Sequence, residues 1–239
     1  MGTARVTVAD RRRVRPGRIA GAATLIAVLT VLSRVAGFGR TMVFAWAVGD
    51  NDLGDTYLAA NLIPNIVFEI VAGGALASLV VPMLAGAITA GDRGAVARTT
   101  AALLTWVLTL LVPLSVLLAL AAEPVVATIL DDPTPGQVTG GATMLRIFAP
   151  QVPLYGVGIV LTGVLQAHRR FAWPVLAPLL SSVTVAGAYV GLVALDGRGA
   201  ALVDLSDAGM WTLAGGTTVG VVVLAGCLVP VVARLRLRL

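Results

Sequence analysis

Long apolar runs separated by short polar segments make up most of this sequence. A helix needs about 20 residues to cross a hydrocarbon core about 30 Å thick, so runs of that length are typical of transmembrane helices. On this rule the pattern predicts six spans, at residues 20–47, 56–88, 96–121, 138–166, 172–195 and 208–233. Several of them exceed the minimum and contain glycine or proline, so we expect tilted or kinked helices.

Composition favours a membrane protein over a soluble domain. Hydrophobic residues make up 58% of the 239 positions and charged residues 12%, and the mean hydropathy is +0.94. A soluble domain of this size needs far more polar surface. We therefore predict an all-α integral membrane protein, a bundle of about six transmembrane helices, with a basic tail at 1–19, a six-helix lobe at 20–233 and a basic end at 234–239. The first apolar run is too long for a signal peptide and lacks a cleavage site, so we expect a retained helix.

Charge alternates between the connecting segments. The chain has 17 basic residues, all arginine, and 13 of them lie in the N-terminal tail, at the C-terminal end and in the connections near residues 93 and 169. The other connections hold nine of the 12 acidic residues. By the positive-inside rule both termini are expected in the cytoplasm. The basic tail is expected to contact anionic membrane lipids, and nucleic acid is not an expected partner.

Residue types that usually carry catalysis or bind metals are scarce. Cys227 is the one cysteine, so neither an intramolecular disulfide nor a thiolate metal site is expected. His168 is the one histidine, and it lies in a connection. The sequence contains no nucleophile and base grouping, metal-ligand spacing or phosphate-binding glycine loop. We therefore expect no enzyme activity, no cofactor and no metal.

Four charged residues remain inside the predicted spans. They are Arg34, Arg40, Glu69 and Arg146. A charge at the membrane centre costs about 2.5–3.5 kcal/mol on insertion scales, so such residues usually face a watery cavity or a partner. Snorkelling to the headgroups is the alternative, and it fits Arg146 best and Arg34 worst. On a helix Arg34 and Arg40 lie about 120° and about 9 Å apart, which lets both line one broad cavity.

The second predicted span carries a polar stripe. Its members recur every four residues, and Asp55 stands just before the stripe: Tyr57, Asn61, Asn65, Glu69 and Gly73. A helix that faces lipid all round would not carry such a stripe. Two alternatives stay open. The asparagines are also suited to hydrogen bonds between helices, and Glu69 to a salt bridge with an intramembrane arginine.

Two blocks of the sequence resemble one transporter family. "SRVAGFGR" followed by "GDTYLAANLIPNIVFEIVAGGALASLVVPML", and then "LRIFAPQVPLYGVGIVLTGVLQAHRRFAWPVLAPLLSS", are similar to the MurJ/MviN family of bacterial lipid II flippases, within the multidrug/oligosaccharidyl-lipid/polysaccharide exporter superfamily. The resemblance covers residues 20–235. Some family members carry an arginine pair after the Pro-Asn of the second helix, where this chain has Phe68 and Glu69.

The resemblance implies a transporter in the bacterial inner membrane. Its cargo would be lipid II, the undecaprenyl-pyrophosphate-linked peptidoglycan precursor, moved from the inner to the outer leaflet for cell-wall synthesis. In the family the residues matching Arg34, Arg40 and Asp55 line or gate a cationic cavity, and guanidinium forks suit pyrophosphate oxygens. The substrate-binding candidates are therefore Arg34, Arg40, Asp55, Asn65, Glu69 and Arg146.

The length of the chain and the identity of the transported molecule each leave alternative interpretations open. Family members have two six-helix lobes and this chain has the pattern of one, so we expect an N-terminal fragment, with a self-associating half-transporter as the alternative. Lipid II and membrane lipids are the expected partners, and a second lobe or cell-wall synthesis proteins stay open. Other functions are export of another polyprenyl-linked sugar, export of a drug, or a non-transporting membrane scaffold. A cationic drug would favour acidic residues in the cavity over arginines.

The charge pattern generates a topological prediction. After replacement of Cys227, Arg93→Cys and Arg169→Cys should react with a membrane-impermeant thiol reagent only from the cytoplasmic side, because arginine-rich connections stay inside. Labelling of intact cells, compared with opened cells, measures this. Labelling of either position from outside would overturn the orientation.

Overall fold

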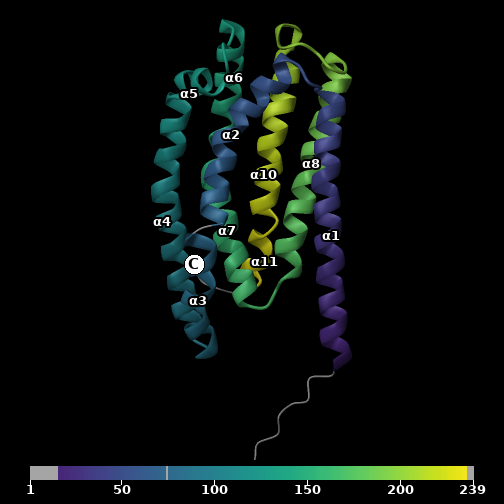
Figure 1. Ribbon diagram of the computed structural model, residues 1–239. Coiled ribbons are helices and arrows are strands. Elements are labelled where there is room, and N and C mark those ends of the chain that lie inside the picture. The colour runs from purple at the N-terminus through teal and green to yellow at the C-terminus, as the bar shows by residue number, and fades with distance from the viewer. Residues whose placement is uncertain (1–15, 74, 236–239) are drawn as a thin grey trace, which may run out of the picture.

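The computed structural model describes residues 16–73 and 75–235, and this part of the chain is helical with no strand (Figure 1). The basic segments at 1–15 and 236–239 lie outside the described residues. The elements are α1 Pro16–Ala47, α2 Asp52–Gly73, α3 Ala75–Thr89, α4 Arg93–Leu120, α5 Ala122–Ile129, α6 Pro135–Phe148, α7 Gln151–Ala167, α8 Ala172–Asp196, the 3-10 turn η1 Leu202–Asp204, α9 Asp207–Met210, the π-helical turn η2 Trp211–Gly215, α10 Gly216–Gly226 and α11 Val229–Ala233. The predicted all-α membrane bundle is confirmed.

Most predicted spans correspond to one helical segment. Five described segments are long and apolar enough to cross a membrane: Thr24–Ala47, Arg93–Leu120, Pro135–Ala167, Ala172–Asp196 and Asp207–Ala233. The predicted second span, 56–88, is instead divided into α2 and α3, which lie on either side of residue 74. Two other spans are composite. The fourth consists of α6 and α7, and the sixth runs from α9 to α11.

Backbone carbonyls at the break between α6 and α7 accept hydrogen bonds from neighbouring helices. Pro153 has no N–H for the carbonyl of Ala149, which accepts instead from the N–H of Val152 at 3.1 Å and from the hydroxyl of Ser115 in α4 at 2.7 Å. The hydroxyl of Thr218 in α10 donates to the carbonyl of Ile147 at 2.9 Å. In a hydrocarbon environment such partners are needed because no water replaces them. Hydroxyl groups of α4 and α10 therefore make the interrupted span possible.

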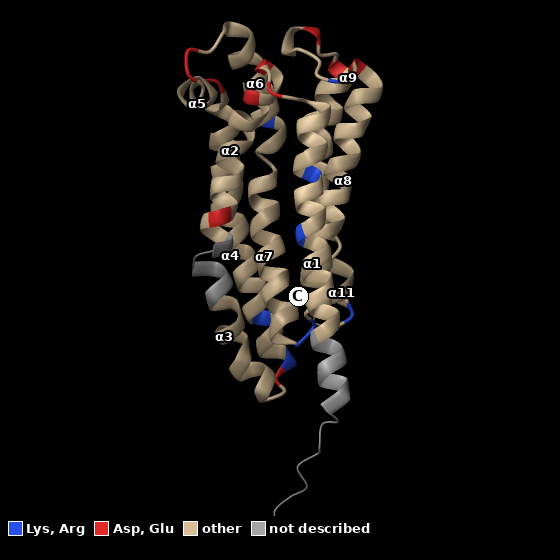
Figure 2. Cartoon of the chain, turned by 45° about the vertical axis from the view of Figure 1, so that its right-hand side comes forward, with Lys and Arg blue, Asp and Glu red and all other residues tan. Residues whose placement is uncertain are grey.

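Charged connections gather at opposite ends of the bundle (Figure 2). The α1–α2, α5–α6 and α8–α9 connections lie at one end, here called the acidic end. The α3–α4 and α7–α8 connections and the end of α11 lie at the other, here called the basic end. The predicted separation of charge is thus present in the fold. Which end faces the cytoplasm stays a prediction.

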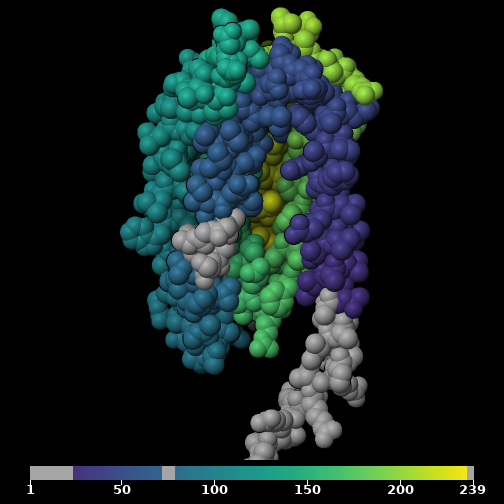
Figure 3. Space-filling model, viewed as in Figure 1, coloured from purple at the N-terminus to yellow at the C-terminus, as the bar shows by residue number. Residues whose placement is uncertain are grey.

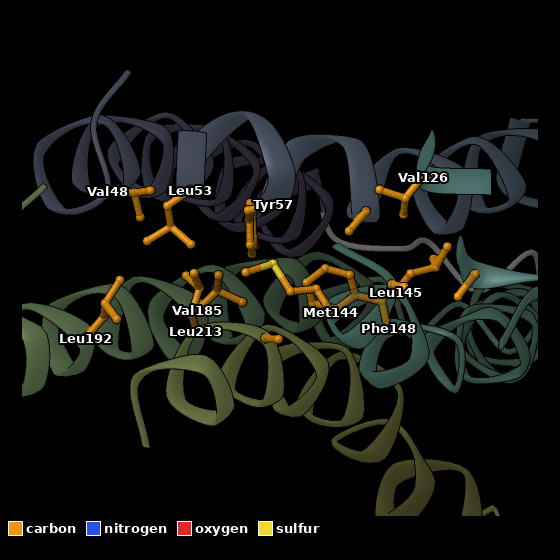
Figure 4. Close-up of a cluster of buried hydrophobic side chains, with 14 of the residues drawn as sticks. Val48, Leu53, Tyr57, Val126, Met144, Leu145, Phe148, Val185, Leu192 and Leu213 are labelled. Carbon is orange, nitrogen blue, oxygen red and sulfur yellow. The ribbon is translucent and has the colours of Figure 1, made fainter. Parts of the chain in front are cut away.

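Two apolar clusters hold the helices together. The cluster nearer the acidic end includes Tyr57, Met144 and Phe148, whose side chains meet between α2, α6 and α8 (Figure 4). The second cluster, nearer the basic end, joins α3, α4, α7 and α11 around Val80 and Val164. By contrast α1 packs mainly on α8. It therefore forms one side wall of the bundle.

Glycines allow α8 and α10 to approach closely. Gly216 and Gly220 are spaced as in a small-xxx-small motif, which lets two helix backbones come together in lipid. A Cβ atom on Gly216 would clash with the Cβ of Ala188, and one on Gly220 would clash with Val185. The Ala188 methyl cannot move without its backbone. Close packing against α8 is therefore the role of Gly216.

Gly216→Ala should destabilise the protein by about 1–3 kcal/mol, because the added methyl overpacks the contact with Ala188. The matched control is Gly187→Ala on α8, where nothing lies within 4 Å of the added atom. This variant should be as stable as the parent or up to about 1 kcal/mol more stable, from helix propensity. Reversible unfolding in mixed micelles measures both. Equal stability of the two variants would contradict the close contact.

Candidate ligand-binding cavity

A cavity of about 280 Å³ lies between α1 and α2, with α7, α8 and α10 behind it. Figure 3 shows the surface hollowed between these two helices, with α8 and α10 at the floor. The residues lining it are Arg40, Thr41, Phe44, Tyr57, Leu58, Asn61, Asn65, Phe68, Tyr155, Ser181, Val185, Tyr189, Thr217, Val221 and Leu224. The lining contains one cation and no aspartate or glutamate.

Arg40 is the charged group of this cavity. Its side chain is half-buried, and among the described residues it has neither an acidic partner nor a hydrogen bond. An unpaired charge at membrane depth is expensive, so such a residue usually faces water or a ligand. Arginine also stays protonated at every relevant pH. The cavity therefore presents a permanent cation to whatever enters it.

Amide groups of α2 supply neutral polar contacts beside Arg40. The side-chain oxygen of Asn61 is buried and has no hydrogen-bond partner within the described structure. Asn65, one turn along, is exposed and also lines the cavity. Buried polar atoms are nearly always hydrogen-bonded, and an exception marks a place for water or a ligand. Arg40, Asn61 and Asn65 together offer both donors and acceptors.

A chain of hydroxyl hydrogen bonds closes the cavity toward the acidic end. Thr217 donates to the carbonyl of Leu213 at 2.8 Å, so its oxygen is left to accept from the hydroxyl of Tyr57 at 2.9 Å. Tyr57 has then used its proton and accepts from Tyr189, also at 2.9 Å. The order of donation is Tyr189, Tyr57, Thr217, Leu213. This chain links α2, α8 and α10 through buried side chains.

Aromatic rings complete the same closure. The ring of Phe44 on α1 lies 5.1 Å from that of Tyr57 and 5.2 Å from that of Tyr189, and Phe148 meets Tyr57 edge-on at 5.5 Å. Such pairs are worth about 0.5–1.5 kcal/mol beyond their area burial. Phe44 therefore joins α1, which already packs on α8, to α2 as well.

Polar contacts between two connections cover this closure. The amide nitrogen of Asn51 donates to the carbonyls of Gly199 and Ala200 at 3.3 Å each. Arg198 donates to the carbonyl of Trp46 at 2.8 Å and lies over its ring. The α1–α2 and α8–α9 connections are thus bonded to each other across the acidic end, which is closed in this structure.

The sequence candidates fall into two groups. Arg40 and Asn65 line the cavity, and Arg34, Asp55 and Glu69 are exposed and are not part of the lining. Among the described residues Glu69 has no salt bridge to an arginine. Phe68 is in the lining, where its ring lies 4.6 Å from that of Tyr155.

Arg146 lies elsewhere. It is in the last turn of α6, near the acidic end, and its guanidinium pairs with Glu123 of α5 at 3.0 Å. Both side chains are exposed, at 45% and 61%, so the pair contributes at most about 1 kcal/mol. The structure accounts for Arg146 by this surface pair and places it outside the cavity, to whose lining α6 contributes no residue.

Sequence reasoning missed several cavity residues. All three tyrosines of the chain line this one cavity, two of them on α7 and α8. The sequence signal that could have identified these tyrosines is that a tyrosine is rare in the apolar helices of this chain. For Thr217 there was none, because hydroxyl residues are common in membrane helices and often bond only their own backbone.

The apolar spans and the cavity lined by Arg40 define a class: a multi-pass α-helical membrane protein with a cation-lined cavity. The chain belongs to the lipid II flippase MurJ family, whose model matches residues 44–239.

Individual relatives agree with this assignment. The chain is 28% identical over 215 residues to a probable lipid II flippase MurJ of Synechocystis sp., covering 85% of this chain and 38% of the relative. It is 31% identical over 163 residues to a lipid II flippase MurJ of Burkholderia cenocepacia, covering 67% and 32%. The matched part of the chain thus spans 32–38% of the length of these relatives.

A solved structure has the same fold. It is described as lipid II flippase MurJ in an inward closed conformation, and it matches with a TM-score of 0.70 at 18% sequence identity. The match covers 88% of this chain and 42% of that one. The helical arrangement described above is therefore that of a MurJ-type structure.

Tyr57→Phe should lower the free energy of unfolding by about 1–2 kcal/mol, because it leaves Tyr189 without an acceptor and Thr217 without a donor. Tyr155→Phe is the matched control, since it loses one 3.3 Å hydrogen bond, to Gln151. In a double-mutant cycle Tyr57→Phe and Tyr189→Phe should be non-additive. Additive effects in unfolding experiments would show that the hydroxyl chain is not a unit.

Proposed function

We propose that this chain forms the cation-lined half of a lipid II flippase in a bacterial plasma membrane, with both termini in the cytoplasm. The observation that carries the proposal is Arg40, an unpaired cation facing a membrane-depth cavity in a member of the lipid II flippase MurJ family. Undecaprenyl-pyrophosphate carries its charge on phosphate oxygens, which a guanidinium binds through two parallel hydrogen bonds. The function is transport and not catalysis.

Recognition of the headgroup would be shared among three kinds of group. Arg40 binds pyrophosphate, Asn61 and Asn65 hydrogen-bond neighbouring polar groups, and the tyrosine rings line the wall against which sugars pack. A volume of about 280 Å³ suits a pyrophosphate and not the whole sugar and peptide part. The remainder would lie in the open side between α1 and α2. The absence of an acidic residue from the lining disfavours a cationic drug as cargo.

The closure at the acidic end determines which leaflet of the membrane the cavity can open to in this conformation. With the basic end in the cytoplasm, the cavity is shut toward the outer leaflet and would take its cargo from the inner one. Release then requires Phe44 to separate from Tyr57 and Tyr189, and the two bonded connections to part. Because α1 packs mainly on α8, it is the element best able to move. Cargo binding would shift the population between this conformation, which is closed at the acidic end, and a conformation that is open there.

Two of the residues that the sequence singled out, Arg34 and Asp55, lie along the proposed path of the cargo. Arg34 is exposed on α1, about 9 Å nearer the basic end than Arg40, where it would meet the pyrophosphate first. Asp55 is exposed in the first turn of α2 at the acidic end, where a carboxylate would act as a gate and not as a pyrophosphate ligand. For Glu69 and Arg146 the geometry supports no contact with the cargo.

The proposal predicts distinct outcomes for arginine variants in the complete gene product. Arg40→Ala and Arg34→Ala should each abolish lipid II translocation while insertion is kept, because losing an intramembrane charge eases insertion by about 2.5–3.5 kcal/mol. Lysine at either position should give partial activity, since it keeps the charge and loses the fork. A leaflet-specific lipid II accessibility assay, with expression level measured in parallel, distinguishes these cases.

The matched control for this experiment is Arg98→Ala, an arginine of α4 outside the cavity lining, which should flip lipid II normally. Normal flipping in Arg40→Ala would remove Arg40 from the cargo path and overturn the proposal.

A further inference from the structure

A second cavity, of about 360 Å³, lies at the basic end and shares no residue with the cavity between α1 and α2. Four segments that are distant in the sequence build it: the end of α3 with the α3–α4 connection, the start of α4, the α7–α8 connection and the end of α11. Its polar side chains are Arg93, Arg170, Arg234, His168 and Asp92. Apolar residues such as Ile88 form the remaining wall.

Within the part of the chain that the structure describes, the charge of this basic-end cavity is not balanced by acidic partners. Among the described residues Arg93, Arg170 and Arg234 have no salt bridge and no side-chain hydrogen bond. The one carboxylate, of Asp92, accepts from the N–H of Ala95 at 2.8 Å and caps α4. Three guanidinium groups therefore face one cavity with an excess of positive charge. Planar guanidinium forks match phosphate oxygens.

The α7–α8 connection holds its basic residues in a strained turn. The N–H of Arg170 bonds to the carbonyl of Leu165 at 2.8 Å and that of Arg169 to Gln166 at 2.9 Å, the two bonds of a Schellman motif. Arg169 takes the left-handed position of this motif, with φ at 58°, where glycine is usual. An arginine in this conformation is uncommon, and strain of this kind concentrates at functional sites. Here it orients two consecutive arginines.

An apolar pocket lies on the other side of the same connection. It has a volume of about 300 Å³, and its walls include Leu25, Ile26, Phe171 and Trp173. Arg170 lines this pocket and also the basic-end cavity. A cationic cavity beside an apolar pocket at the end of transmembrane helices matches the two parts of a phospholipid, whose headgroup is charged and whose chains are apolar.

We propose that the basic-end cavity binds the phosphate of an anionic membrane phospholipid, with an acyl chain in the adjoining apolar pocket. Basic pockets between transmembrane helices suit such headgroups, since both charge and hydrogen bonds are offered where phosphates naturally lie. The site is separate from the cargo cavity, so it stands or falls independently of the transport function. The two sources of a phosphate group, a lipid and the free ion, are separated by the experiment below.

The experiment uses native mass spectrometry of the full chain released from micelles that contain a known lipid. Dioleoylphosphatidylglycerol should be retained at one copy with at least about 10-fold higher affinity than dioleoylphosphatidylcholine. Arg93→Gln should reduce this affinity by about 5-fold to 10-fold, because one charge-assisted contact is lost. Arg93→Lys should give a smaller loss, since the charge remains and the fork does not.

The matched control is Arg98→Gln, which removes the same charge from the same helix outside the cavity and should change retention less than 2-fold. An equal loss in Arg93→Gln and Arg98→Gln, with unchanged thermal unfolding, would show general surface attraction and overturn the site. Equal retention of the two lipids would overturn it too. Displacement of the lipid by millimolar inorganic phosphate, with phosphate bound alone equally well, would assign the cavity to the free ion instead.

Discussion

The absence of water from the bilayer interior is the constraint on which this structure depends. Every backbone group that a proline or a helix break releases must find a partner within the protein. Ser115 and Thr218 meet this need at the break between α6 and α7, and they do so from two other helices. The break therefore connects α10 with α6, and α4 with the junction between α6 and α7. The span that the sequence predicts as one helix, 138–166, is thus interrupted in the structure, and the interruption is where other helices are bonded to it.

The same constraint explains the hydroxyl chain at the closed end of the cavity. A buried tyrosine hydroxyl in an apolar environment needs a partner, and Tyr57 and Tyr189 find one in each other and in Thr217. The order of donation ends on the carbonyl of Leu213, so every proton in the chain is used. Phe44 adds ring contacts from α1. Phe44 and the hydroxyl chain thus join α1, α2 and α8 at the closed end of the cavity.

Charge is distributed in two different ways in this molecule. Arg146 is neutralised by Glu123 at the surface, and Arg198 is held by the carbonyl of Trp46. Arg40 and the arginines of the basic-end cavity have no such partners among the described residues. Because an unpaired guanidinium in a concave, partly dry place attracts phosphate strongly, the two proposed anion sites are the two cavities that unpaired arginines line.

The sequence by itself determined the membrane environment, the helical class, five of the six predicted spans and the separation of charge between the two ends, because these depend on local hydrophobicity and on loop composition. It also singled out Arg40 and Asn65, since a polar residue in an apolar helix is conspicuous. The tertiary structure decided which of these residues share a cavity. It separated Arg146 from Arg40, and it brought Tyr155, Tyr189 and Thr217 to the cavity from distant helices. Only helix packing assembles Arg93, Arg170 and Arg234 into one site. A helix face has a definite direction only once its neighbours are in place, so no pattern along the chain contains this information.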